Sequence, residues 1–519
     1  MRKILTALVT LFLITGFSAE AQKKPKKASP SKPSYPTTVS VKVDMDLNIV
    51  RDDKLMVTVT PPKITSENTT YCIPRTVPGT YSTDNYGKFV DDLKAFDNKG
   101  NELAVNHEGD NCWTIANAPQ LAKITYWVND TFDVEYTHDI FSPAGTNINE
   151  GTNFLLNTHG FIGYFKEFLQ TPYELTIAHP SGLWGATSMT DADGSDVKDR
   201  FTTTRYAELV ENPIMYSKPD YTTFNINGMD ILISVYSPTG KYTAEMITPD
   251  MKTMMIAQKN FLGSFNSTKK YTVLLYLTDL RKKDAKGFGA LEHPTATTVV
   301  MPELLPKKQM GEQMKDVVSH EFFHIVTPLT IHAKQIQDFD YNDPKMSAHL
   351  WMYEGVTEYF ANLFQVNQGL ISEKEFFGRM KEKVRNASRM NDTMPFTEMS
   401  ANVLVKPYKD QYLNVYEKGA LIGMCVDIII REKSNGQRGI LDLMQRLSKE
   451  YGINKAFDDA DLFDKITMLT YPEVGDFLKT YVSGDKPIPY AAYFAKMGVT
   501  DYEFTDTAKS ELKEAWLKK

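Results

Sequence analysis

The sequence contains little histidine, little cysteine and no excess of positive charge. Nine histidines and three cysteines occur among 519 residues, and the formal net charge is −7. The negative charge argues against a nucleic-acid partner, because binding phosphates requires clustered Lys and Arg. No apolar run reaches the roughly 20 residues of a transmembrane helix, so we expect no membrane span. Nothing in the composition indicates an oligomeric state.

The three cysteines allow at most one disulfide within the chain. Cys72 and Cys112 fall in one region predicted to be rich in strands, and they could pair in an oxidising compartment. Cys425 lies in an apolar helical segment, which predicts a buried free thiol. The sequence leaves the pairing of Cys72 with Cys112 open.

The first residues have the pattern of a secretory signal. Arg2 and Lys3 precede an apolar run, and the small residues Ala19 and Ala21 mark a cleavage site. We therefore predict a signal peptide over residues 1–21 and a basic linker of Pro, Lys and Ser over residues 22–38. The mature protein is expected to be exported, either to the periplasm or out of the cell.

Beyond the linker the periodicity changes twice. Apolar residues alternate with polar ones in "VSVKVDMDLNI", which predicts a strand, and similar segments continue through a β domain at 39–215. Strands and helices mix over 216–310, and helical spacing dominates 311–500, before a short C-terminal tail at 501–519. Ser372 and Glu375 form a capping box at the start of one helix. The order predicts an α+β fold.

The clearest chemical motif is "VVSHEFFHIV". His320 and His324 are four residues apart, so on a helix both imidazoles project from one face and can bind one metal ion. Glu321 can act there as a base toward water. The motif alone is also compatible with two histidines that serve packing only.

A catalytic zinc site needs a third protein ligand. "LWMYEGVTEYFANLF" offers Glu354 and Glu358, four residues apart on an aromatic-rich helix. Burying an acid among such neighbours is costly unless it is paired or bound to a metal. His332 and His349 are competing ligands by residue type.

Further segments show a resemblance to a known family. They are "HEFFH", "EGVTEYF", "GLIS", "YEKGAL", "IPRTVPGTYSTDNYGKFVDDLKAFDNKGNELAV", "AELVENPIM", "YGINKAF" and "KPIPYAAYFAKMGV". Together they resemble the glycyl-aminopeptidase family of gluzincin zinc peptidases over most of residues 39–499. The resemblance implies an N-terminal β-sandwich-like domain followed by a thermolysin-like catalytic domain, made of a mixed sheet and a helical bundle.

The resemblance also implies roles for individual residues. Glu354, the acid of "EGVT", becomes the third zinc ligand, and Glu358 then lies behind the ligands or on the surface. Tyr416, in "YEKG", matches the tyrosine that hydrogen-bonds the oxyanion in related gluzincins. A phenol suits that role because it can donate to a developing negative charge without carrying a charge itself.

"GFGALEHPTATTVV" resembles the family's Gly-Gly-Leu-Glu-His stretch on the strand that lines the active site. By this resemblance Gly289, Ala290, Glu292 and His293 contact the substrate, and Glu292 binds its free α-amine. Ala290 stands where the family has its second glycine. Small side chains leave little reason to expect a large N-terminal residue.

The chain departs from the family pattern in two further places. It has "IVTPLT" after the zinc helix where the family often has Trp-Asn. Only about twenty residues follow "AKMGV", and we therefore expect no C-terminal PDZ domain. Asp427, an acid within the apolar run "MCVDIIIRE", has no role that the sequence explains.

The sequence therefore predicts an exported zinc metallopeptidase that acts on peptides with a free N-terminus. Zinc held by His320, His324 and Glu354 activates water, and Glu321 and Tyr416 assist the chemistry. The residue removed is expected to be small, Gly or Ala. If Glu292 does not face the active site, the same fold would serve a zinc endopeptidase. The remaining alternative is a peptide-binding protein with an inactive site.

Overall fold

The computed structural model describes residues 39–134, 140–265 and 268–518. The predicted signal peptide and the predicted linker lie outside these residues. None of the described helices is long and apolar enough to span a lipid bilayer.

The N-terminal part is built on a seven-stranded sheet. In spatial order its strands are β14 (Lys198–Thr203), β12 (Tyr173–Ala178), β1 (Val41–Arg51), β2 (Lys54–Thr60), β8 (Leu121–Asn129), β4 (Val90–Asp97) and β5 (Glu102–Leu103). Alternate residues of β1 are buried, as the period-two pattern predicts. The strand thus places one apolar face against the core of this part.

Two four-stranded sheets complete the N-terminal part. One contains β13 (Trp184–Ala186), β15 (Ile214–Ser217), β10 (Asn153–Leu156) and β9 (Asn147–Asn149). The other contains β11 (Tyr164–Phe165), β3 (Asn68–Cys72), β7 (Cys112–Ala116) and β6 (Val105–Glu108). Cys72 and Cys112 are opposite each other on β3 and β7 and form a disulfide, whereas Cys425 is a buried free thiol.

A five-stranded mixed sheet begins the second part of the chain. Its order is β16 (Tyr221–Ile226), β17 (Met229–Tyr236), β18 (Lys270–Thr278), β20 (Ala296–Pro302) and β19 (Gly289–His293). β18 lies between two parallel neighbours and is almost wholly buried, which explains its continuous apolar sequence. β19 is the antiparallel edge strand and contacts the first long helix of the helical part.

Helices make up most of the remainder. Those described are α1 (Tyr206–Val210), α2 (Ala244–Leu262), α3 (Lys307–Phe323), α4 (Lys334–Gln337), α5 (Thr357–Asn367), α6 (Glu373–Ala387), α7 (Phe396–Ala401), α8 (Lys418–Lys433), α9 (Ile440–Glu450), α10 (Leu462–Leu469), α11 (Pro472–Phe477), α12 (Tyr490–Lys496) and α13 (Ser510–Lys518). The short strands β21 (Val499–Thr500) and β22 (Glu503–Phe504) pair with each other. The Ser372 hydroxyl accepts from the Glu375 amide at the start of α6, so the predicted cap is confirmed.

The last residues belong to the packed structure. α13 buries Trp516, whose indole N–H donates to the Tyr359 hydroxyl at 2.8 Å. The segment that the sequence suggested was a tail is therefore anchored in the helical part by a buried aromatic contact.

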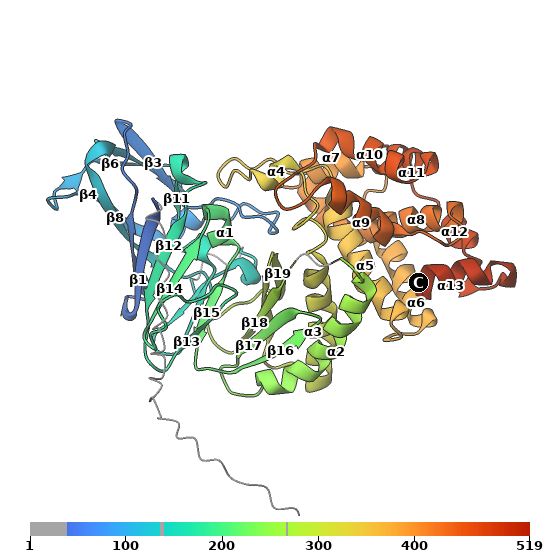
Figure 1. Ribbon diagram of the computed structural model, residues 1–519, viewed down its shortest axis with the longest axis horizontal. Helices are drawn as coiled ribbons and strands as arrows, with labels where there is room; N and C mark the ends of the chain where they lie inside the picture. The colour runs from blue at the N-terminus through green and yellow to red at the C-terminus, as the bar shows by residue number, and fades with distance from the viewer. Residues whose placement is uncertain (1–38, 135–139, 266–267, 519) are drawn as a thin grey trace, which may run out of the picture. The chain divides into compact units, whose positions relative to one another are not determined.

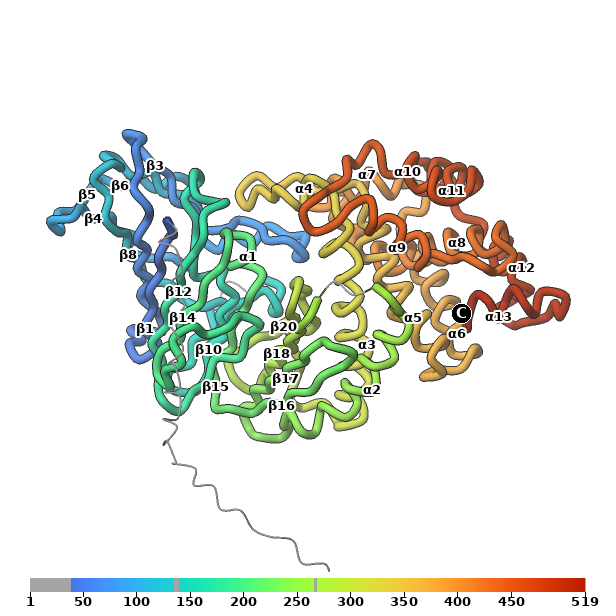
Figure 2. Tube along the Cα trace, viewed as in Figure 1, coloured from blue at the N-terminus to red at the C-terminus, as the bar shows by residue number. Residues whose placement is uncertain are grey.

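Figure 1 shows the strands of the N-terminal part in blue to green, the helices from α3 onward in yellow to red, and β19 between them. Each part has its own large hydrophobic core, and a third, smaller cluster contains residues of both parts, among them Met215 and Tyr276. One loop crosses from the first part to the second: Figure 2 shows the blue segment after β3 extending toward the helices. The predicted α+β arrangement is confirmed, and this crossing loop brings the N-terminal part to the site described next.

Candidate metal centre and peptidase site

The two histidines of the HExxH motif lie at the end of α3. The helix ends at Phe323, and His324 is its C-terminal cap. Both side chains are buried, and their ring centroids are 4.8 Å apart. The helical spacing therefore brings both imidazoles to one face, as the sequence predicts.

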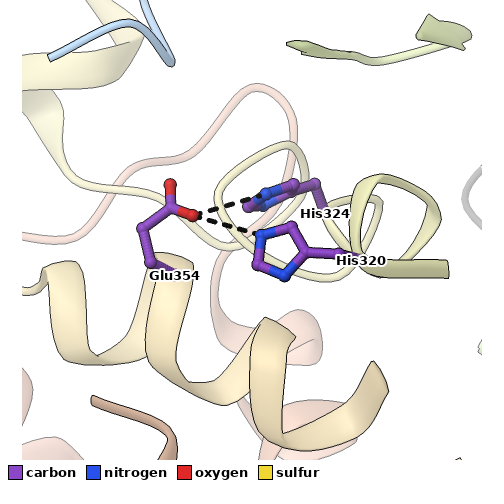
Figure 3. Close-up of side chains that lie close together, drawn as sticks. All are labelled: His320, His324 and Glu354. Atoms are coloured by element: carbon purple, nitrogen blue, oxygen red, sulfur yellow. Dashed lines mark hydrogen bonds and ion pairs between the residues drawn. The ribbon is translucent and has the colours of Figure 1, made fainter. Parts of the chain in front are cut away.

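Glu354 approaches both histidines from a neighbouring segment. It lies in a π-helical turn, Trp351–Val356, directly before α5. Its Oε2 is 3.3 Å from His320 Nε2 and 3.7 Å from His324 Nε2, as Figure 3 shows. π-Helical turns re-aim side chains relative to a regular helix and are frequent at functional sites.

The hydrogen bonds of the two rings leave their Nε2 lone pairs facing Glu354. His320 Nδ1 lies 2.9 Å from Glu358 Oε2, and His324 Nδ1 lies 3.2 Å from the carbonyl oxygen of Thr327. When both Nδ1 atoms donate, two nitrogen lone pairs and a carboxylate oxygen converge with no donor between them. That arrangement suits a cation, and two imidazoles with one carboxylate form a typical catalytic zinc set.

Glu358 supports this arrangement from behind His320. Its Oε1 is 2.7 Å from the Lys383 ammonium and accepts from the Asn362 amide at 3.0 Å. Burial raises the pKa of Glu358, but Lys383 and His320 outweigh that effect and hold it below its usual range. Glu358 is thus an ionised carboxylate that orients His320.

Glu321 and Glu292 face the same space. One ligand atom each of Glu292, Glu321 and His324 lies within 4.8 Å of the other two. Glu321 is buried, and its Oε2 has no hydrogen-bond partner among the described residues. Burial raises the pKa of Glu321 to about 8. Burial, together with the negative charges of Glu354 and Glu321, raises the pKa of Glu292 well above its usual value.

Tyr416 lies on the other side of His320. Their ring centroids are 5.6 Å apart. The Tyr416 hydroxyl is 2.7 Å from the hydroxyl of Tyr412, which lies in the 3-10 helix Tyr408–Val415. The backbones of Gly355 and Gly419 touch behind this group: a Cβ on Gly355 would lie 2.3 Å from the Gly419 carbonyl carbon. This contact brings the start of α8, with Tyr416 before it, against the turn that holds Glu354.

The loop after β3 contributes a residue that the sequence did not single out. The Tyr81 hydroxyl donates to Glu354 Oε1 at 2.8 Å, and its ring is 5.5 Å from that of Tyr412. Gly79 lies in the left-handed region, and a Cβ there would be 2.8 and 2.9 Å from the Glu292 oxygens. The only local signal is the Pro-Gly turn in "VPGTY", which does not indicate where the loop goes.

The other residues of the β19 motif have different neighbours from those of Glu292. His293 is the next residue along the strand and so points to the opposite face, where its Nδ1 is 2.7 Å from Glu211 Oε2. Gly289 packs on the Phe141 ring, and Ala290 is partly buried against the core. Of the two titratable residues of this motif, Glu292 lies near His324 and His293 faces Glu211, whereas Ala290 shares the strand face of Glu292.

The competing ligands are engaged elsewhere. His332 Nδ1 lies 3.0 Å from the Pro328 carbonyl oxygen, and His349 Nε2 lies 2.9 Å from that of Asp459. The described residues bring neither of them into the group of His320 and its neighbours.

Asp427 is a structural residue of α8. It is fully buried, accepts from Arg431 Nε at 3.0 Å and from the Tyr359 hydroxyl at 2.7 Å, and caps Ile440 N at 2.8 Å. Arg431 follows four residues later on the same helix, which is the spacing of a helical ion pair.

Comparison with known proteins decides the family. The profile of the peptidase M61 N-terminal domain matches residues 42–218, and that of the M61 glycyl aminopeptidase matches residues 313–422. The chain belongs to the M61 glycyl aminopeptidase family. It is therefore a peptidase, and the family and its structural neighbours indicate a metal cofactor. No curated protein matches the sequence.

Solved structures agree with the M61 fold. An aminopeptidase N family protein from Idiomarina loihiensis matches 89% of this chain and 78% of its own, at 20% identity and a TM-score of 0.75. An M1 zinc metallopeptidase from Deinococcus radiodurans with a bound Tyr-Ser-Ala substrate matches 87% of this chain over 95% of its own length, at 11% identity and a TM-score of 0.54. Yeast LTA4 hydrolase matches 87% of this chain over 68% of its own length, at 12% identity and a TM-score of 0.53. At these identities the likeness shows the fold.

Proposed function

We propose that this M61 protein is an exported zinc aminopeptidase that removes small N-terminal residues, Gly or Ala, from peptides. The observation that carries the proposal is the position of Glu292, which has an oxygen within 4.8 Å of ligand atoms of Glu321 and His324. The α-amine and carbonyl carbon of one residue are only about 2.5 Å apart. A carboxylate so near the reacting groups therefore selects the first peptide bond.

His320, His324 and Glu354 are the residues that would hold zinc. Three protein ligands of the nitrogen and oxygen type, with a further position left open, characterise catalytic rather than structural zinc. When bound, zinc supplies a Lewis acid that polarises the scissile carbonyl and promotes ionisation of water.

Glu321 transfers the proton, and Tyr416 stabilises the negative charge that develops on the substrate. Glu321 has a buried oxygen without a partner among the described residues, so it can accept a proton from the attacking water and return it to the leaving amine. The Tyr416 hydroxyl donates to the oxyanion of the tetrahedral intermediate. Its contact with Tyr412 holds that hydroxyl in place before substrate binds.

Glu292 binds the substrate ammonium. Burial and the charges of Glu354 and Glu321 raise its pKa, and within the described residues no cation pairs with it. An α-ammonium supplies that partner and favours the ionised form. An acetylated N-terminus cannot.

The surroundings of Glu292 support a small first residue. Gly79 approaches the Glu292 oxygens so closely that it has no room for a Cβ, and that Cβ would also meet Leu291 Cδ1 at 2.7 Å. Tyr81 lies in the same loop and bonds Glu354. These contacts leave limited space beside the substrate Cα.

Two observations support export to the periplasm or beyond. The first 21 residues have the composition of a signal peptide. The disulfide between Cys72 and Cys112 suits an oxidising compartment, since structural disulfides are rare in the cytosol.

A matched set of peptides tests the function. Wild type should release the first residue from peptides that begin with Gly or Ala, should act poorly on those that begin with Phe or Leu, and should not cleave N-acetylated versions. Glu292→Gln should lower kcat/KM by about 100-fold or more, because a buried ammonium loses its charged partner. The control is Glu211→Gln, because Glu211 contacts His293 on the opposite face of β19. Equal cleavage of acetylated peptides would instead identify an endopeptidase, and no cleavage of any peptide by the zinc-loaded protein would favour a binding protein.

A further inference from the structure

A second group of carboxylates lies far along the N-terminal part, where the β1–β2 hairpin meets the end of β8. Lys54 of β2 pairs with Asn129 of β8, so the residues just beyond them, Asp53 and Asp130, are brought to the same end of the sheet. Asp133 follows in the loop after β8. One carboxylate oxygen of each of the three aspartates lies within 4.8 Å of the other two.

Asp130 is the buried member of the group. Its side chain has no solvent exposure, and Oδ2 accepts from the Ile148 amide at 2.6 Å. Oδ1 is buried as well and has no hydrogen-bond partner among the residues that the structure describes. A buried carboxylate oxygen without a donor or cation is strongly unfavourable. The side chain therefore has an unfilled requirement for a positive partner on the side where the other two carboxylates gather.

Among the described residues, the cations next to this group in sequence are engaged elsewhere. Lys54, the nearest lysine in sequence, pairs with Asp91 at 2.6 Å. Arg51 lies over the Trp127 ring at 5.9 Å and 3.8 Å from Asp52. Within the described part of the chain, no ion pair involves any of the three clustered aspartates.

We propose that Asp53, Asp130 and Asp133 bind a calcium ion. Calcium prefers oxygen ligands at 2.3–2.6 Å, so two oxygens on one ion lie at most about 5 Å apart, and all three pairs meet that limit. An all-carboxylate set favours such a hard cation over zinc, which prefers nitrogen and sulfur. Partly exposed Asp133 leaves room for water to complete the coordination. The ion would tie the hairpin to the loop after β8 and so stabilise the N-terminal part.

The hairpin supplies a matched pair of variants. Asp52 and Asp53 are adjacent, and both have left-handed backbones, with φ of 50° and 63°. Asparagine tolerates that region, so Asp52→Asn and Asp53→Asn remove the same charge without new backbone strain. The Asp52 side chain is 86% exposed and lies outside the group. Only Asp53→Asn should affect the ion.

The test uses the full mature chain, kept loaded with zinc and freed of calcium by dialysis. Calcium chloride is titrated in a calorimeter, and Tb³⁺ emission sensitised by Trp127 is recorded in parallel. Wild type and Asp52→Asn should bind one equivalent of Ca²⁺ and gain thermal stability with it. Asp53→Asn should bind at least about tenfold more weakly, as expected when a site loses one of three charged ligands. Asp130→Asn, which keeps an acceptor for Ile148, should abolish binding.

Any of three results would overturn the proposal. One is the absence of saturable Ca²⁺ binding by wild type up to about 10 mM, beyond the weakest affinities of extracellular calcium modules. Another is equal affinity in wild type and Asp53→Asn, a comparison that stands even if Asp130→Asn fails to fold. Tighter binding of Mg²⁺ than of Ca²⁺ would also refute the calcium assignment. None of these measurements depends on peptidase activity.

Discussion

Replacing Tyr81 with phenylalanine tests whether the N-terminal part contributes to the metal centre. The change removes one hydroxyl, which donates to Glu354 Oε1 at 2.8 Å, and leaves the ring that packs near Tyr412. Glu354 is 2% exposed, so water cannot replace the lost donor. Without it, no described residue donates a hydrogen bond to Glu354 Oε1.

The size of the effect follows from that burial. A hydrogen bond to a charged group contributes about 1.5–3 kcal/mol, and its loss leaves a buried acceptor unpaired. At 1.36 kcal/mol for each factor of ten, this corresponds to roughly 10- to 150-fold. Loss of an outer-shell partner of a metal ligand typically costs about 10–100-fold in metal affinity or activity. We therefore expect zinc binding by Tyr81→Phe to weaken by about 30-fold.

Competition with a chromophoric zinc chelator measures this affinity directly, and kcat/KM at saturating zinc gives a second value. Tyr86→Phe is the control, because Tyr86 is a buried tyrosine of the same segment but donates to the Ala144 carbonyl at 3.0 Å. It should lose stability but keep its zinc affinity. Zinc affinity of Tyr81→Phe within about twofold of wild type would refute the role of this hydroxyl.

Three other perturbations have defined outcomes. Glu321→Gln should retain one equivalent of zinc while kcat falls by about 10²–10⁴-fold, and activity within about tenfold of wild type would exclude it as the base. Asp427→Ala should lower the free energy of unfolding by about 3–5 kcal/mol in urea titrations, because Arg431 keeps a buried charge, whereas Asp442→Ala at a partly exposed pair should cost under about 1 kcal/mol. Reducing the disulfide, which closes a 40-residue loop, should cost about 4 kcal/mol; an unchanged urea midpoint would show that the loop is not closed in solution.

The local parts of the site could be predicted from the sequence. Two histidines four residues apart must share a helical face, and Ser372 with Glu375 must cap a helix start, because both patterns depend only on helical geometry. The third member of the group needed the family resemblance, since Glu354 and Glu358 have the same spacing and similar neighbours. The structure separates them: one approaches both Nε2 atoms, and the other bonds His320 Nδ1.

The long-range parts could not be predicted. Tyr81 and Glu354 are 273 residues apart, and no periodicity links a turn of the first domain to a helix of the second. His293 shows the opposite case, because a motif places it beside Glu292 while strand alternation turns it toward Glu211. Neither the carboxylate group near Asp130 nor the packing of Trp516 leaves a signature in the local sequence.

The contact between Gly355 and Gly419 sets how far the two sides of the reaction centre stand apart. Gly355 follows Glu354 directly, and Tyr416 lies three residues before Gly419. Because main chain meets main chain there, a methyl group on Gly355 would clash with the Gly419 carbonyl and push the phenol away from the carboxylate, and one on Gly419 would lie only 3.0 Å from the Gly355 Cα. A relative could thus keep both histidines, both glutamates and the tyrosine and still be a dead enzyme. Judging such relatives by their reactive side chains alone would overlook the two positions that have none.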